Sequence, residues 1–133
     1  LCPSDPFMIM RYATLLIYLG KPEEALAEIT NAKRIDPFCP DMLFEDEGMC
    51  YFWLDRLPEA VDAFNKLQIP TRNSLFYLAA THNNIGDIDK ASRVLKEAIA
   101  MSSLSVENFV KTQKYRDPDK KENLLNSLTA IAA

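Results

Sequence analysis

The chain of 133 residues has few of the residues that build catalytic and metal sites: one histidine, three cysteines and three glycines. The glycines are isolated, which excludes a glycine-rich phosphate-binding loop. No nucleophile lies at a spacing that would pair it with His82, and neither Cys-x-x-Cys nor mixed Cys/His ligand spacing occurs. These absences predict a chain that is not itself an enzyme and that binds no cofactor or metal ion.

Long apolar runs and an excess of positive charge are missing as well. Apolar runs such as LLIYL at 15–19 are far shorter than the ~20 residues of a membrane span. The net charge is −4, so nothing in the overall charge favours phosphate groups. The odd number of cysteines without paired spacing argues against a disulfide framework. We therefore expect no nucleic-acid partner, no membrane contact and a cytoplasmic location.

A degenerate repeat is the main feature that is present. Ala60 lies 35 residues after Ala25, and Ala91 lies 31 residues after Ala60; each alanine follows a short polar turn, in the sequences EEAL, PEAV and DKAS. A period of about 34 residues is typical of arrays of helix–turn–helix units. Small residues suit the points where two helices joined by a short turn cross. We expect Ala13, Gly48 and Ala79 to face these three alanines, with Ile29, Phe64 and Leu95 filling the space between adjacent pairs.

The apolar periodicity predicts an all-α fold with helices over 6–19, 22–35, 41–54, 58–67, 72–85, 88–101 and 119–130. Gly20 and Gly86 end the first and fifth helices, and Asp55 takes the place of a turn glycine. Leu1-Cys2-Pro3 is similar to Ile35-Asp36-Pro37, so the chain is expected to be a piece of a longer protein. The predicted organisation is the end of a preceding repeat at 1–5, repeats at 6–40, 41–71 and 72–103, and a linker with a C-terminal capping helix at 104–133.

The repeats resemble the tetratricopeptide repeat over residues 6–103, which implies a right-handed α-solenoid of about three repeats. Residues 105–128, after the last repeat, indicate which proteins with this repeat the chain resembles most. Ser105-Val106-Glu107-Asn108-Phe109, then Lys114-Tyr115-Arg116-Asp117-Pro118, then Leu124-Leu125-x-x-Leu128 is similar to the end of the tetratricopeptide region of bacterial class III adenylate/guanylate cyclases and of some membrane-bound winged-helix regulators. Ala130-Ile131-Ala132 departs from the Ala-Gly ending of that region.

The resemblance implies that the first helix of each repeat lines a concave groove that binds a protein or peptide. The positions that carry the chaperone-binding carboxylate clamp are Met10, Glu45 and Phe76 here, which disfavours an acidic C-terminal peptide. An aromatic and Met-rich strip remains, and such side chains are enriched at interface cores. Some of these residues are alternatively expected to pack inside the fold or under the last helix, Ile17 and Phe52 above all. The groove-facing set is Met10, Arg11, Thr14, Ile17, Tyr18, Glu45, Asp46, Met49, Phe52, Trp53, Phe76, Tyr77, Ala80, Asn83 and Asn84.

The expected function is a non-catalytic protein-interaction or regulatory module in a larger bacterial signalling protein; the alternative is homo-oligomerisation of that protein. The acidic residues Asp41, Glu45, Asp46 and Glu47 are expected on a solvated face or lining the groove, although 41 and 45 share a helix face on which a weak divalent-cation site is conceivable. His82 is expected to be a packing residue. The final helix is expected to cap the stack, to fold into the groove as an internal inhibitor, or to swap between chains.

Overall fold

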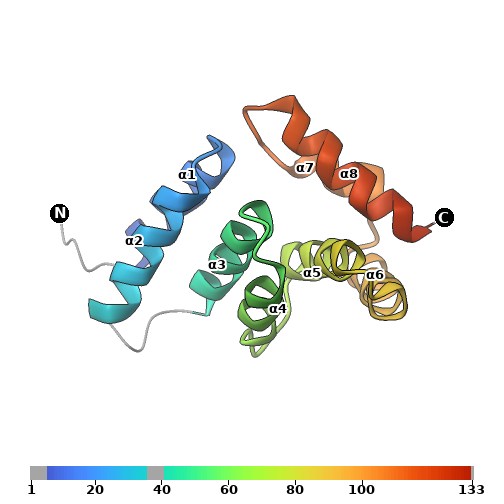
Figure 1. Cartoon of the computed structure of the whole chain (residues 1–133), viewed down its shortest axis with the longest axis horizontal. Coiled ribbons are helices and arrows are strands. Elements are labelled where there is room, and N and C mark those ends of the chain that lie inside the picture. The colour runs from blue at the N-terminus through green and yellow to red at the C-terminus, as the bar shows by residue number, and fades with distance from the viewer. Residues whose placement is uncertain (1–5, 36–40, 133) are drawn as a thin grey trace. The chain divides into compact units, whose positions relative to one another are not determined.

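A computed structural model describes residues 6–35 and 41–132, and within them the chain forms eight α-helices and no strand (Figure 1). The chain divides into two compact units, Leu1–Gln68 and Ile69–Ala133. The helices of unit 1 are α1 (Pro6–Tyr18), α2 (Pro22–Ile35), α3 (Met42–Trp53) and α4 (Leu57–Asn65), and those of unit 2 are α5 (Arg72–Ile85), α6 (Ile88–Ser102), α7 (Val106–Thr112) and α8 (Pro118–Ala132). The predicted end of a preceding repeat at 1–5 and the stop at Asp36-Pro37 lie outside the described residues.

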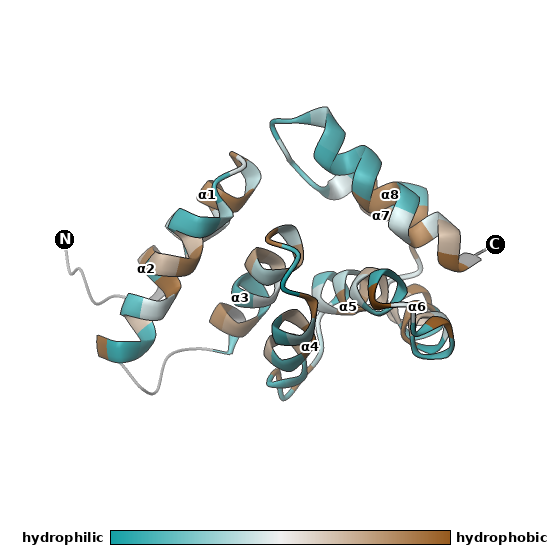
Figure 2. Cartoon of the chain, in the orientation of Figure 1, coloured by the Kyte–Doolittle hydropathy of each residue, from teal (hydrophilic) through white to brown (hydrophobic). Residues whose placement is uncertain are grey.

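The helices pack mainly as sequential neighbours: α1 with α2, α3 with α4, and α5 with α6. All six predicted helices of these pairs are confirmed, and their ends match the prediction or differ from it by at most two residues. Apolar and polar positions alternate along them, as Figure 2 shows in brown and teal, so each helix has a face to bury.

The three turns inside these pairs have the same backbone structure. After α1, the N–H of Gly20 donates to the carbonyl of Ile17 (3.0 Å) and the N–H of Lys21 to that of Leu16 (2.8 Å). The same two hydrogen bonds recur after α3, where the turn residue is Asp55, and after α5, where it is Gly86. This is the Schellman motif, which needs a residue with positive φ. The φ angles are +84° at Gly20, +60° at Asp55 and +102° at Gly86, so the predicted replacement of glycine by aspartate is confirmed.

The small residues expected at the helix crossings are buried. The side chains of Ala13, Ala25, Ala60, Ala79 and Ala91 are completely buried. At Gly48 a Cβ atom would lie only 2.6 Å from Cε1 of Phe64, so the ring of α4 rests directly on the backbone of α3. Phe64 therefore fills space inside its own pair, and the expectation that it lies between adjacent pairs needs this correction.

The tail contains a helix that was not predicted. Residues 104–118 were expected to be a linker, but Val106–Thr112 forms α7, which begins where the Ser105 hydroxyl accepts a hydrogen bond from the N–H of Asn108 at 3.2 Å. Its two turns are too short for apolar periodicity to reveal it. The last helix, α8, packs against α5, α6 and α7 of the same chain and buries Leu124 and Leu128 completely.

The contact at Gly48 can be tested, because it predicts that a glycine-to-alanine change lowers the free energy of unfolding where such a change ordinarily raises it. A glycine-to-alanine change within a helix ordinarily stabilises by about 1 kcal/mol. Gly48→Ala should instead lower the free energy of unfolding by roughly 1–3 kcal/mol, because the new methyl group overlaps the Phe64 ring. Urea denaturation followed by circular dichroism measures the change. In Gly48→Ala/Phe64→Leu the loss should be smaller than the sum of the single losses; simple additivity would show that the two residues are not in contact.

Candidate functional site

The predicted groove residues of unit 1 come from α1 and α3, which pack against each other. Met10, Thr14, Tyr18, Glu45 and Trp53 are half-buried, and Arg11 is exposed. These six residues are the predicted set that a partner can reach in unit 1, and we call them the α1/α3 surface.

Four other predicted residues of unit 1 lie in its interior: Asp46, described below with the acidic cluster, and Ile17, Met49 and Phe52. Ile17 is 1% exposed, Met49 1% and Phe52 6%, so the prediction that Met49 and Phe52 face a partner needs correction, whereas the alternative of burial for Ile17 and Phe52 is confirmed. Phe52 has an indirect role at the surface. Its ring meets Trp53 edge to face, with ring centroids 4.9 Å apart, and so limits the orientations that the indole can adopt.

In unit 2 the predicted face of α5 is covered by the chain's own tail. Phe76 and Tyr77 are completely buried, which corrects their assignment to an open groove. Phe109 of α7 stacks on Phe76 with ring centroids 4.0 Å apart. The Tyr77 hydroxyl donates to Oε1 of Gln113 at 2.7 Å and lies 2.6 Å from the hydroxyl of Tyr115.

The remaining predicted residues of α5 are divided between interior and surface. Ala80 is completely buried, Asn83 is half-buried and Asn84 is exposed. Asn83 Nδ2 donates to Oδ1 of Asn84 at 3.4 Å. The face of α5 that was expected to bind a partner is thus reduced to these two amides in its C-terminal turn.

Gln113 and Tyr115 are the structurally important residues that sequence reasoning missed. Both are nearly inaccessible, at 1% and 6% exposure, although they lie in the predicted linker. Gln113 Nε2 also donates to Thr112 Oγ1 at 3.1 Å and to Asn73 Oδ1 at 3.4 Å. The serine cap at Ser105, followed by apolar residues at 106, 109 and 110, was the signal that could have revealed an ordered segment here.

The acidic cluster is partly buried, contrary to the expectation of a solvated face. Asp46 is 4% exposed and Glu47 7%. Glu47 Oε2 pairs with Nζ of Lys33 on α2 at 2.8 Å. Asp41 and Glu45 are half-buried. In the described parts of the chain, no group of three or more His, Cys, Asp or Glu side chains is arranged to hold a metal ion.

Asp46 belongs to a hydrogen-bonded chain between α3 and α1. Thr14 Oγ1 lies 2.8 Å from Asp46 Oδ2 and 2.9 Å from the Met10 carbonyl oxygen. One hydroxyl proton cannot serve both acceptors fully. Burial raises the pKa of Asp46 to about 7, against the opposing effect of the Thr14 hydrogen bond and with a further upward effect from Glu45. Thr14 is the donor to Asp46, and this hydrogen bond links α1 to α3.

His82 and Cys50 are interior residues. His82 is 9% exposed, and burial lowers its pKa; nearby Asp87 opposes this shift, while Lys90 and Arg93 add to it. Burial also raises the pKa of the Cys50 thiol, which keeps it in the protonated, weakly nucleophilic form. Cys2 and Cys39 lie outside the described residues. None of the helices described combines the length and hydrophobicity that crossing a bilayer demands.

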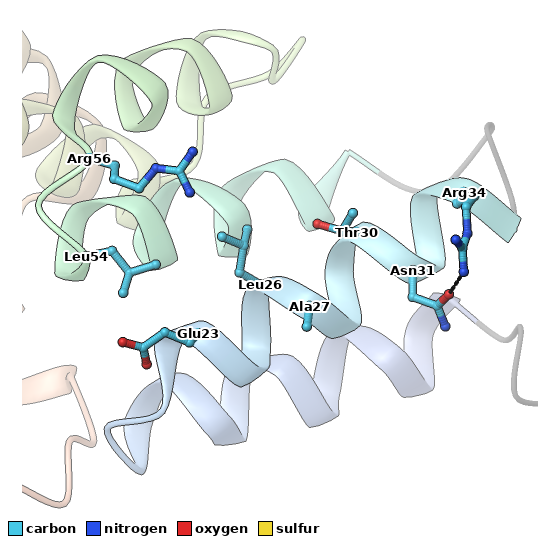
Figure 3. Close-up of a pocket in the computed structure, with 8 residues that line it drawn as sticks. All are labelled: Glu23, Leu26, Ala27, Thr30, Asn31, Arg34, Leu54 and Arg56. Atoms are coloured by element: carbon cyan, nitrogen blue, oxygen red, sulfur yellow. Dashed lines mark hydrogen bonds between the residues drawn. The ribbon is translucent and has the colours of Figure 1, made fainter.

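A separate hollow of about 530 Å³ lies on unit 1, between α2 and the turn that joins α3 to α4 (Figure 3). Its two arginines are already engaged: Arg34 donates to Asn31 Oδ1 at 2.8 Å, and Arg56 pairs with Glu59 at 2.6 Å. It brings together no nucleophile and base. The residues that line it are Glu23, Leu26, Ala27, Thr30, Asn31, Arg34, Leu54 and Arg56.

Comparison with known proteins adds no relative. No protein-family model matches the chain, and no curated protein or solved structure matches it significantly. The function proposed below therefore depends on the residues and their geometry.

The buried carboxyl group predicts a pH-dependent stability difference. Asp46 holds its proton to about pH 7 when folded but ionises near its ordinary pKa of 3.8 when unfolded. The contribution of Asp46 to the free energy of unfolding is therefore fully present below pH 3.8 and is lost as the pH rises from there toward 7. Asp46→Asn should stabilise the chain by roughly 2–4 kcal/mol at about pH 8 and by little at about pH 4, as chemical denaturation would show.

The exposed Asp62 of α4 provides the matched control. Asp62→Asn should give no comparable change with pH. A constant effect of Asp46→Asn at both pH values would contradict a buried, protonated Asp46.

The polar cluster under the tail predicts a second stability effect. Tyr77→Phe removes the hydroxyl that donates to Gln113 and lies 2.6 Å from the Tyr115 hydroxyl, so the cluster loses a buried hydrogen bond. We expect the free energy of unfolding to fall by about 1–3 kcal/mol, measured by denaturation with urea. Tyr51→Phe, at a half-buried position in unit 1, is the control and should cost less. Equal losses would show that the Tyr77 hydrogen bonds contribute nothing specific.

Proposed function

We propose that this chain is a non-catalytic protein-interaction or regulatory module of the tetratricopeptide type. The single observation that carries this proposal is the threefold recurrence of one unit: a pair of packed helices, a Schellman turn with positive φ, and small buried residues at the crossing. Repeats of this kind present extended surfaces for partners. The right-handed solenoid arrangement of the repeats is part of the proposal.

The parent protein is proposed to be a bacterial signalling protein, such as a class III adenylate/guanylate cyclase, acting in the cytoplasm. The tail motif that suggests this parent, from Lys114 to Pro118, includes Tyr115, and Tyr115 is tied to α5 through Tyr77. A structural role for the tyrosine agrees with a motif that ends a repeat array.

The ligand is proposed to be a protein segment with apolar side chains, bound on the α1/α3 surface. Met10, Tyr18 and Trp53 supply a flexible thioether and two large rings, and such residues dominate the energy of interfaces. The ring of buried Phe52 packs edge to face against the Trp53 ring. Glu45 brings a negative charge to a position that is basic in the carboxylate clamp of chaperone-binding repeats, so an acidic C-terminal peptide is a poor fit.

Enzymatic activity within this chain finds little support in the placement of its reactive groups. His82 and Cys50 are both buried, and the buried acidic side chains pair with Lys33 or with Thr14. A catalytic role for His82 would require activity in the isolated chain that His82→Gln removes.

Peptides selected from a phage-displayed library on the intact chain test the proposed function. Titration calorimetry of a selected peptide should show at least a ~10-fold weaker affinity for Trp53→Ala and for Tyr18→Ala, because each removes an aromatic anchor. Ile99→Ala, at an exposed position of α6, should bind as the unchanged chain does. If no peptide is enriched, or if both aromatic variants bind with full affinity, the α1/α3 surface is not the binding site.

A further inference from the structure

The carboxyl group of Asp46 lies at the interface between α1 and α3, in contact with a residue of the α1/α3 surface. Asp46 is 4% exposed, and its Oδ2 accepts a hydrogen bond from Thr14 Oγ1 at 2.8 Å. Thr14 is half-buried and belongs to the α1/α3 surface. Its hydroxyl also lies 2.9 Å from the Met10 carbonyl oxygen, so one proton is shared between two acceptors. A partner bound on the α1/α3 surface would therefore lie next to a carboxyl group that is held by one divided hydrogen bond.

The second oxygen of this carboxyl group is within reach of solvent. In the parts of the chain that the structure describes, Thr14 is the one residue that hydrogen-bonds to the Asp46 side chain, and it binds Oδ2. Every buried side-chain oxygen of these residues has a hydrogen-bond partner. Because Oδ1 has none, it must touch water. A donor that comes from outside the chain would therefore meet Oδ1.

Asp46 has no positive charge beside it, in contrast to its neighbour on α3. Glu47 pairs with Lys33 Nζ at 2.8 Å. Burial raises the pKa of Asp46 to about 7, the Thr14 hydrogen bond opposes this shift, and Glu45 adds to it; no basic residue is among these influences. Carboxylates in protein interiors are ordinarily paired with a cation. The place that such a cation would take at Asp46 is thus not filled by the described residues.

The helices that pack against α3 supply no other charge to this carboxyl group. On α1, Arg11 is exposed three residues before Thr14, where water screens its charge. On α2, Lys33 is engaged by Glu47. The buried residues of α4 carry no charge. On α3 itself the Cys50 thiol stays protonated, because burial and the neighbouring carboxylates raise its pKa.

We propose that the partner segment bound on the α1/α3 surface carries a lysine or arginine whose charged end binds Asp46. This inference rests on the partner-binding role proposed above and adds the chemistry of the partner. Glu45 brings a second negative charge to the surface, and Met10, Tyr18 and Trp53 offer apolar contacts. Lysine and arginine have long apolar stems that pack along such side chains while the charged end reaches a carboxylate. The expected partner is an apolar segment with one basic residue, opposite in charge to an acidic C-terminal peptide.

Binding of a basic side chain to Asp46 has a thermodynamic effect of defined sign. A cation beside the carboxylate stabilises its ionised form, so binding lowers the pKa of Asp46 from about 7 and releases a proton. The affinity should therefore rise as the pH rises through 7, because the free chain has then already lost this proton. A partner without a basic residue would only remove water from Asp46, which favours the protonated form and gives the opposite dependence on pH.

Peptides selected at about pH 8 from a phage-displayed library on the intact chain are the probe for this proposal. We expect a lysine or arginine at one recurring position among apolar residues. A selected peptide, made without histidine and with a blocked N-terminus, should bind ~10- to 30-fold more tightly at about pH 8 than at about pH 5.5 in titration calorimetry. Titrations at about pH 6 in two buffers of different ionisation enthalpy should show that binding releases a proton.

Asp46→Asn keeps the shape of the side chain and removes its charge. This variant should bind the peptide at least ~10-fold more weakly at about pH 8, and both the pH dependence and the proton release should disappear. Asp62→Asn, at an exposed position of α4, should bind as the unchanged chain does. Replacing the basic residue of the peptide by norleucine should cause a similar loss on the unchanged chain and little further loss on Asp46→Asn.

Three results would overturn this proposal and leave the partner-binding role in place. The first is a set of peptides that lose affinity for Trp53→Ala but share no basic residue. The second is an affinity that falls as the pH rises through 7. The third is a peptide whose basic residue contributes equally to binding of the unchanged chain and of Asp46→Asn. If the library yields no peptide at all, the α1/α3 surface is not the binding site and both proposals are wrong.

Discussion

Two helices joined by a turn of a few residues can pack along their length only if neither carries a large side chain where they cross. In this chain the constraint is met with alanine on both sides of two pairs, and with Gly48 and Ala60 in the third. Gly48 is the extreme case, since even one methyl group would overlap the ring of Phe64. The Schellman turns depend on the same closeness, because they reverse the chain within the few residues that separate the helices. The register of each pair therefore follows from its crossing and its turn.

The part of unit 2 that follows α6 contributes to the core through contacts with residues far away in the sequence. Unit 2 completes its core with residues that are distant in sequence: Phe109 stacks on Phe76, and Gln113 and Tyr115 satisfy the hydroxyl of Tyr77. A tyrosine buried without hydrogen-bond partners would cost free energy, so the tail has to be present for Tyr77 to be an interior residue. The same packing removes the α5 face from the possible binding surface and leaves the α1/α3 surface as the place where the predicted aromatic side chains meet solvent.

Unit 1 combines buried charge with exposed apolar surface. Asp46 and Glu47 are neighbours on α3, yet Glu47 pairs with Lys33, whereas Asp46 bonds to a neutral hydroxyl and retains its proton to about pH 7. Burial is the main cause of the raised pKa of Asp46, and the Thr14 hydrogen bond opposes it. Elsewhere on the same unit, Met8, Tyr12, Leu15 and Leu19 of α1 and the turn after it are 38–52% exposed.

The amino-acid sequence by itself determined the all-α character, six helices of the three pairs, their turns and the small residues at their crossings. These features depend on local periodicity and on the backbone preferences of glycine, aspartate and proline, which neighbouring residues decide. The tertiary structure alone decided that Asp46 and Glu47 are buried, that Phe76 and Tyr77 lie beneath α7 and the segment after it, and that Met49 and Phe52 support the surface instead of forming it. On the predicted face of each first helix, sequence periodicity identifies the side chains but not what covers them. That depends on contacts between residues far apart in the chain, such as Thr14 with Asp46 and Tyr77 with Gln113, which no local pattern encodes.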